Sequence, residues 1–261
     1  MSAHSQFFPG RWPTFVQPSR NDKPQDGLDR FALAVIGVAA CFIALALRSP
    51  FSVGVVAGAA VMAVYGWWMK DARLVVIASF LPGFTLLAWL ANYWVYQLTP
   101  HTIDGQLSRL DLGSAAAIWK WCESEPLVHS ALSLAYYALG VAAGIAIAVS
   151  KRRAELLKAC VIAPILGIPL YLLFPAVGPR WIGQAAARNC FPSMHVAWAA
   201  FFWMYTSDKW KLAMAGVLAV TVAATIGLGE HYFVDLVAAI PFVWAVSKLA
   251  AVKPATEGGV Q

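Results

Sequence analysis

Eight long runs of apolar residues constrain this chain of 261 residues more than any other feature. Hydrophobic residues make up 60% of the sequence and charged residues only 12%, whereas about a quarter of a soluble domain is charged. A run of about 20 apolar residues crosses a bilayer as a helix, because the helix satisfies its own backbone polar groups. The runs predict membrane-spanning helices at residues 31–47, 51–69, 74–98, 127–149, 159–177, 193–207, 211–228 and 232–250.

The sixth run is the weakest of the eight, because Asp208 and Lys209 follow it closely. It fits a short or tilted helix, or one joined to a re-entrant loop, as well as a full span. With this reservation, the sequence predicts an all-α, polytopic membrane helix bundle of about eight spans. One catalytic domain at residues 31–250 accounts for them, with a cytoplasmic tail before it at residues 1–30 and a second tail at residues 251–261.

Two glycine pairs fall inside the predicted spans with a spacing of four residues, Gly54 with Gly58 and Gly140 with Gly144. Small residues at this spacing allow helices to approach closely in a membrane. We therefore expect these positions to pack helices of the bundle against each other.

The distribution of charge indicates an orientation in the membrane. The net charge is +6, and 14 of the 19 lysines and arginines fall in segments on the same side as the N-terminus. This asymmetry is the positive-inside rule, so the basic excess reports topology and not nucleic-acid binding. We expect an integral protein of a bacterial inner membrane, with both termini in the cytoplasm and the opposite ends of the spans on the periplasmic side.

Two short segments carry the candidate chemistry, Asn189–His195 and Gly229–Asp235. The predicted topology brings both to the outer end of the bundle, where an ionisable group near hydrocarbon indicates function. On a helix, His231 and Asp235 would share a face. Asp235 would then bind one ring nitrogen of His231 and leave the other free to attack phosphorus. His195 would protonate the leaving oxygen.

Three further residues are candidates for binding phosphate. Ser193 follows a proline and has the pattern of a helix N-cap, where first-turn N–H groups bind anions. Arg180 and Arg188 lie on the same outer loop and can neutralise phosphate oxygens. Ser193 also fits a cap without contact to phosphate, and Arg188 also fits an ordinary charge at the membrane rim.

A metal site is the competing interpretation of two histidines and a carboxylate. The closely spaced HExxH pair of many zinc enzymes is missing, since Glu230 directly precedes His231. We therefore expect neither a catalytic metal nor another cofactor. Cys122 and Cys190 are both expected on the outer side. Whether they form a disulfide stays open, because their spacing in the sequence does not give the distance between their Cα atoms.

These residues resemble the motifs of the type 2 phosphatidic acid phosphatase superfamily. Its PSxH motif is matched by Pro192, Ser193 and His195, and its HxxxD motif by His231 and Asp235. The resemblance implies a six-helix membrane core, here about residues 74–250, with two helices added before it. It also implies a phosphohistidine on His231, His195 as general acid and no metal.

The chain departs from the family pattern at two cationic positions. Leu173 stands where the first motif has a lysine, and Thr225 where the third motif has an arginine. In this it is similar to the branch that contains inositol phosphorylceramide synthase, whose hallmarks resemble the segments Phe174–Arg180, Asn189–Trp198 and His231–Asp235. Arg180 is the first candidate for the missing cation, and Arg188 the second.

Three functions compete at this point. The favoured one is a membrane lipid phosphatase whose substrate is a lipid phosphate, an isoprenoid diphosphate or a phospholipid. A lipid phosphotransferase would use the same residues and replace water with an alcohol acceptor. A transporter or scaffold is the third, but transporters carry polar residues near the middle of several spans, and these runs are nearly free of them. Membrane lipids are the expected surroundings, nucleic acid is not an expected partner, and the oligomeric state stays open.

Overall fold

The computed structural model describes residue 37, residues 50–184 and residues 186–251. The predicted tail 1–30, all of the first predicted span 31–47 except residue 37, and all but the first residue of the tail 251–261 lie outside the described residues. The described part is all-helical, with one isolated bridge between Ser150 and Thr206 and no strands. Its elements are α2 (Pro50–Trp68), α3 (Ala72–Leu98), α4 (Asp104–Leu110), α5 (Ser114–Ser124), α6 (Pro126–Tyr137), α7 (Leu139–Val149), α8 (Arg153–Leu173), the 3₁₀ turn η1 (Pro179–Trp181), α9 (Met194–Tyr205), α10 (Asp208–Gly227) and α11 (Phe233–Ala250).

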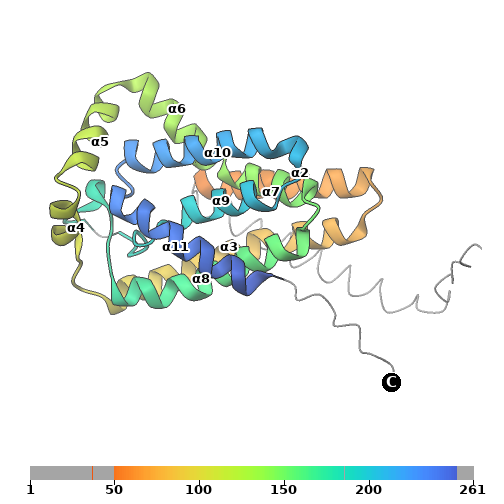
Figure 1. The fold of residues 1–261 in the computed structure, drawn as a ribbon, viewed down its shortest axis with the longest axis horizontal. Coiled ribbons are helices and arrows are strands. Elements are labelled where there is room, and N and C mark those ends of the chain that lie inside the picture. The colour runs from red at the N-terminus through yellow and green to blue at the C-terminus, as the bar shows by residue number, and fades with distance from the viewer. Residues whose placement is uncertain (1–36, 38–49, 185, 252–261) are drawn as a thin grey trace, which may run out of the picture.

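Five of these helices are long and apolar enough to cross a membrane: α2, α3, α8, α10 and α11. Helices α6 and α7 are separated by one residue and bent by 40° relative to each other. If they count as one broken span, they add a sixth crossing. The long helices run side by side along the long axis of the molecule (Figure 1). The described residues therefore have the helices of an integral membrane protein, with five or six spans.

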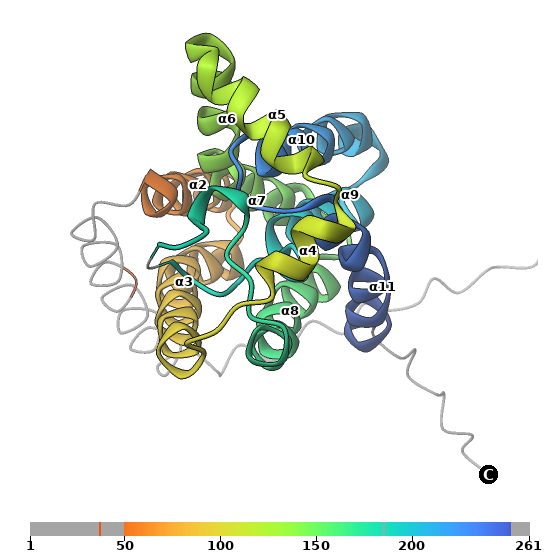
Figure 2. The same cartoon turned by 90° about the vertical axis from the view of Figure 1, so that its left-hand side faces the viewer.

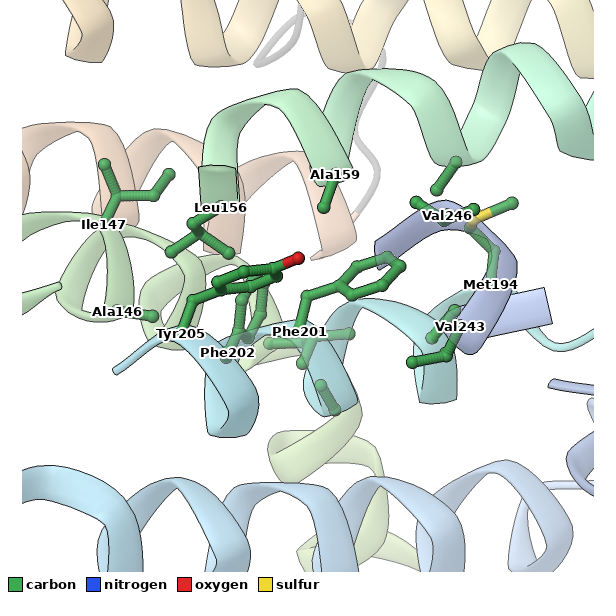
Figure 3. Close-up of a cluster of buried hydrophobic side chains, with 14 of the residues drawn as sticks. Ala146, Ile147, Leu156, Ala159, Met194, Phe201, Phe202, Tyr205, Val243 and Val246 are labelled. Atoms are coloured by element: carbon green, nitrogen blue, oxygen red, sulfur yellow. The ribbon is translucent and has the colours of Figure 1, made fainter. Parts of the chain in front are cut away.

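The predicted sixth span, residues 193–207, is the short helix α9. Its 12 residues reach about 18 Å, well short of the roughly 30 Å of a hydrocarbon core. Helices α7, α8, α10 and α11 pack around it, and its side chains Phe201, Phe202 and Tyr205 fill the centre of the bundle (Figure 3). Because protein surrounds α9, its ends need not reach the membrane surfaces.

The C-terminal end of α9 is fixed at one end of the bundle. The Ser150 hydroxyl, in the turn between α7 and α8, donates to the Tyr205 carbonyl at 2.7 Å. The Lys211 ammonium donates to the carbonyls of Trp203 and Met204 at 2.7 and 2.8 Å, which satisfies acceptors that a helix end leaves free. Asp208 and Lys209 begin α10 and do not interrupt a span.

At the other end of the bundle, the segment between the predicted spans 74–98 and 127–149 contains two short helices that the apolar runs did not predict. These are α4 and α5, which lie across the ends of the longer helices (Figure 2). Hydrophobicity did not predict them, because they are short and held by contacts to distant segments. They cover the region into which the N-terminal ends of α9 and α11 point.

The glycine pairs pack α2 against α7, as the sequence predicts. A Cβ added at Gly58 would collide with the backbone carbonyl of Gly140, and one added at Gly144 would collide with that of Gly58. A side chain at either position would force the two backbones apart. Close approach through small residues therefore joins these two helices.

Candidate functional site

The two sequence motifs meet where α9 and α11 begin. Ser193 is the buried N-cap of α9, and its hydroxyl accepts a hydrogen bond from the Val196 N–H at 3.5 Å. The Ser193 N–H donates to the Asp235 carbonyl at 3.3 Å, within the first turn of α11. This backbone bond joins the PSxH segment to the HxxxD segment and places His195 beside His231.

The predicted triad residues lie close together. The ring centroids of His195 and His231 are 6.0 Å apart, and Nδ1 of His231 lies 3.5 Å from Oδ2 of Asp235. His231 and Asp235 are both buried. The sequence placed them on one helix face, but His231 precedes α11, which begins at Phe233. Asp235 reaches back because its carboxylate caps the Tyr232 N–H at 2.7 Å.

Cys190 lies beside both the histidine and the carboxylate, a contact that sequence reasoning missed. Its Sγ is 2.7 Å from Oδ2 of Asp235 and 3.4 Å from Nδ1 of His231. The disulfide left open for Cys122 and Cys190 is not formed, since both are free thiols. The position of Cys190 within the Asn189–His195 motif was the only signal in the sequence.

Cys190, His231 and Asp235 also form the donor set of a conceivable metal site, with ligand atoms within 4.8 Å of one another. Zinc binds the thiolate form of cysteine. Burial, and then the charge of Asp235, raises the pKa of the Cys190 thiol well above its ordinary value. Without a metal ion, the same contact is a hydrogen bond from the neutral Cys190 thiol to Asp235.

His195 faces a cavity of about 280 Å³. The Tyr136 hydroxyl lies 3.3 Å from its Nδ1, and the two rings are 4.5 Å apart. With Nδ1 engaged by Tyr136, Nε2 is the nitrogen left for a substrate. Asn92 and Asn189 add polar groups to the cavity wall. Tyr136 belongs to no sequence motif, so only the structure identifies it.

Arg180 is held beside the loop that carries His231. Its backbone N–H donates to the Gly229 carbonyl at 3.0 Å, and its guanidinium lies over the Trp181 ring at 5.0 Å. Trp181 in turn donates from Nε1 to the Glu230 carboxylate at 3.1 Å. Burial raises the pKa of Glu230 above its ordinary value.

Arg188 is buried and bound to neutral groups. Its Nε donates to the Thr99 carbonyl at 3.3 Å, and its guanidinium lies 5.1 Å from the centre of the Tyr96 ring. These contacts tie the loop to the end of α3. The next residue, Asn189, lines the cavity of His195, so Arg188 lies near the site without a carboxylate among these partners.

Two aspartates of the α4 segment hold the site loops together, and sequence reasoning missed them. The Asp104 carboxylate accepts from the N–H groups of Val177 and Gly178 and from the Tyr232 hydroxyl, at 3.0 to 3.2 Å. Asp111 accepts from the Phe233 N–H at 3.0 Å. The donors lie on the segment before Arg180 and around the start of α11, so α4 fixes these two segments relative to each other.

The two positions that lack the family cations take other roles here. The side chain of Leu173, at the end of α8, is exposed. The Thr225 carbonyl accepts hydrogen bonds from the N–H groups of Glu230 and His231, at 3.0 and 3.2 Å. Thr225 thus supports the histidine loop through its backbone, and neither position supplies a positive charge.

Comparison with known families agrees with the position of the motifs. Residues 183–249 match the model of the PAP2 superfamily. The matched interval contains Arg188, Ser193, His195, His231 and Asp235, whereas Arg180 precedes it. No curated protein and no solved structure matches the chain. The match supports assignment of the C-terminal part of this membrane protein to the PAP2 superfamily.

Proposed function

We propose that the protein is an integral membrane lipid phosphatase that cleaves a lipid phosphate ester or diphosphate through a phosphohistidine on its outer face. The proposal rests on the close arrangement of His195, His231 and Asp235. The two ring centroids are 6.0 Å apart, and Nδ1 of His231 is 3.5 Å from Oδ2 of Asp235. The match of this region to the PAP2 superfamily supports the class of chemistry.

In the first step, Nε2 of His231 forms a bond to phosphorus while the bond from phosphorus to the lipid oxygen breaks. His195 gives a proton to that oxygen, and the lipid leaves as an alcohol, or as a lipid phosphate when a diphosphate is cleaved. Asp235, with Cys190 beside it, keeps Nδ1 of His231 turned away from phosphorus. Water then attacks the phosphohistidine, His195 takes a proton from it, and inorganic phosphate is released.

Phosphate binding in this proposal relies on the N-terminus of α9 and on the two arginines. Ser193 caps α9, and N–H groups of a helix first turn bind anions. Arg180, beside the His231 loop, is the first candidate to neutralise phosphate oxygens, and Arg188 the second. Arg188 would do so while its guanidinium stays fixed by the end of α3.

The test is phosphate release by purified protein in detergent, with EDTA present, from a panel of lipid phosphates, isoprenoid diphosphates and phospholipids. We expect release by the wild type and none by His231→Ala. A variant as active as the wild type would end the proposed mechanism. Loss of activity in EDTA that zinc restores would favour a metal site at Cys190, His231 and Asp235 instead.

The phosphotransferase alternative uses the same residues and differs in the acceptor. It is supported by the segment Phe174–Arg180, which resembles that of inositol phosphorylceramide synthase. If the wild type releases no phosphate alone but transfers a phosphorylated headgroup when an alcohol such as inositol is added, the transferase replaces the phosphatase.

A further inference from the structure

A second cavity adjoins the one that contains His195. It measures about 290 Å³ and shares Phe51, Val55, Thr85 and Trp198 with the first. Four common wall residues make the two cavities direct neighbours. The first reaches toward the α4 end of the bundle, and the second continues toward the opposite end.

The order of lining residues along three helices shows this direction. On α3, the His195 cavity is lined up to Asn92, and the second cavity is lined down to Ile77, a separation of about 22 Å along a helix. On α8, Tyr171 lines the first cavity and Leu157 the second. On α9, the walls pass from His195 through Trp198 to Phe202.

The chemical character changes along the same line. The His195 cavity has polar groups on its wall, among them Asn92, Tyr136 and Asn189. The second cavity is lined almost entirely by aliphatic and aromatic side chains, with Thr85 at the junction and Cys160 as its other weakly polar group. A chamber with polar groups next to an apolar one matches a ligand with a charged head and a hydrocarbon tail.

The short helix α9 runs along both cavities, with His195 and Trp198 lining the first and Trp198 and Phe202 lining the second. Its C-terminal end is fixed at the level of the turn between α7 and α8, and its length is about 18 Å against roughly 30 Å for the hydrocarbon core. His195 lies in the first turn of α9, so a chain that leaves a phosphate beside it can extend along α9 toward Phe202.

From these observations we infer that the second cavity, between α3, α7 and α8, binds the hydrocarbon chain of the phosphate-bearing lipid. The inference rests on the proposed function for the identity of the headgroup. It predicts that kcat/KM rises with the length of the hydrocarbon chain, because each buried methylene group adds to the binding free energy. A substrate with a very short chain occupies only the chamber of His195.

The experiment compares hexadecyl phosphate with butyl phosphate for wild type and Ala143→Phe, which fills the second cavity from α7. We expect kcat/KM for the long substrate to fall by about tenfold, the effect of expelling about two methylene groups, with the short substrate unaffected. The matched control is Ala131→Phe at an exposed position of α6, which should change neither. Equal effects of Ala143→Phe on both substrates would overturn the chain site.

A second measurement does not depend on turnover or on the folding of a variant. A hexadecyl phosphate with a photoreactive diazirine at its chain end is bound to wild-type protein, irradiated and mapped by mass spectrometry. Labelling of α7 or α8 near Ala143, Leu157 and Cys160 supports the site, and labelling confined to lipid-facing residues such as Leu212 refutes it. If the protein is labelled in the cavity but releases no phosphate, the phosphatase proposal fails and the chain site stands.

Discussion

The carboxylate of Asp235 is enclosed more completely than any other charged group of the site. Its exposed fraction is 0%, and its Oδ2 accepts from the Cys190 thiol and the Tyr232 N–H, both at 2.7 Å. In the described part of the chain, its Oδ1 has no hydrogen-bond partner. A buried carboxylate with so few donors is costly, which is typical of a group retained for function.

Replacement of Asp235 by asparagine tests this role. We expect Asp235→Asn to fold and to lower the rate by about two to four orders of magnitude, because the amide no longer fixes the tautomer of His231. The matched control is Asp111→Asn, which alters another carboxylate that binds the start of α11 but does not contact the histidine. Comparable rates for the two variants in the phosphate-release assay would remove Asp235 from the mechanism.

The Cys190 thiol gives a prediction about pH. Burial and Asp235 raise its pKa above the ordinary value of about 8.5, so the neutral thiol persists as pH rises through that value. Alkylation requires the thiolate. We expect iodoacetamide to leave Cys190 unmodified in native protein between about pH 7 and about pH 9, and to modify it after unfolding in SDS, as measured by peptide mass spectrometry. Rapid modification of native protein near pH 8 would contradict a neutral thiol.

The sequence predicted only those residues of the candidate site that belong to the motifs. The motifs singled out His195, His231 and Asp235, and the structure places them together, while their catalytic roles stay predictions. The contacts of Cys190 and Tyr136 with the two histidines were not predicted, because contacts across 41 or 59 residues leave no pattern in one sequence.

Whether a helix could be predicted from the sequence depended on the interactions that determine its length and position. The bilayer fixes the length and hydrophobicity of a span, so the apolar runs located α2, α3, α10 and α11 to within three residues, whereas α8 begins six residues before the predicted run. The length of α9 and the existence of α4 depend instead on tertiary contacts, such as those of Asp104 with segments more than 70 residues away. Hydropathy contains no information about such contacts.

The interface of α2 and α7 gives a prediction about stability. A methyl group at Gly58 has no room beside the Gly140 carbonyl, so Gly58→Ala should cost about 1–3 kcal/mol as other overpacked substitutions do. Gly216→Ala on α10 is the matched control, because its Cβ meets nothing within 4 Å and alanine favours a helix. Thermal unfolding in detergent should show a lower Tm for the first variant and an unchanged or higher Tm for the second. Equal shifts would mean that the interface tolerates separation.

For the whole molecule, the decisive property is which end of the bundle faces out. The helices α4 and α5 cover the end with the histidines (Figure 2), whereas the turn between α7 and α8 lies at the opposite end, beside the C-terminal end of α9. From the positive-inside rule we expect that turn, with Lys151, Arg152 and Arg153, to lie in the cytoplasm. The proposed phosphatase would then act on lipids of the outer leaflet.

Cysteine labelling in spheroplasts tests this orientation. Leu112→Cys introduces a thiol at an exposed residue between α4 and α5, and Lys151→Cys introduces one in the exposed turn before α8. An impermeant maleimide should label the first variant in intact spheroplasts and the second only after permeabilisation, with the wild type as the blank for native cysteines. The reverse pattern would place His195 and His231 on the cytoplasmic side, and the substrate would then have to come from the inner leaflet. Labelling of both variants before permeabilisation would contradict a single orientation, since lysines and arginines concentrated on one side favour one orientation.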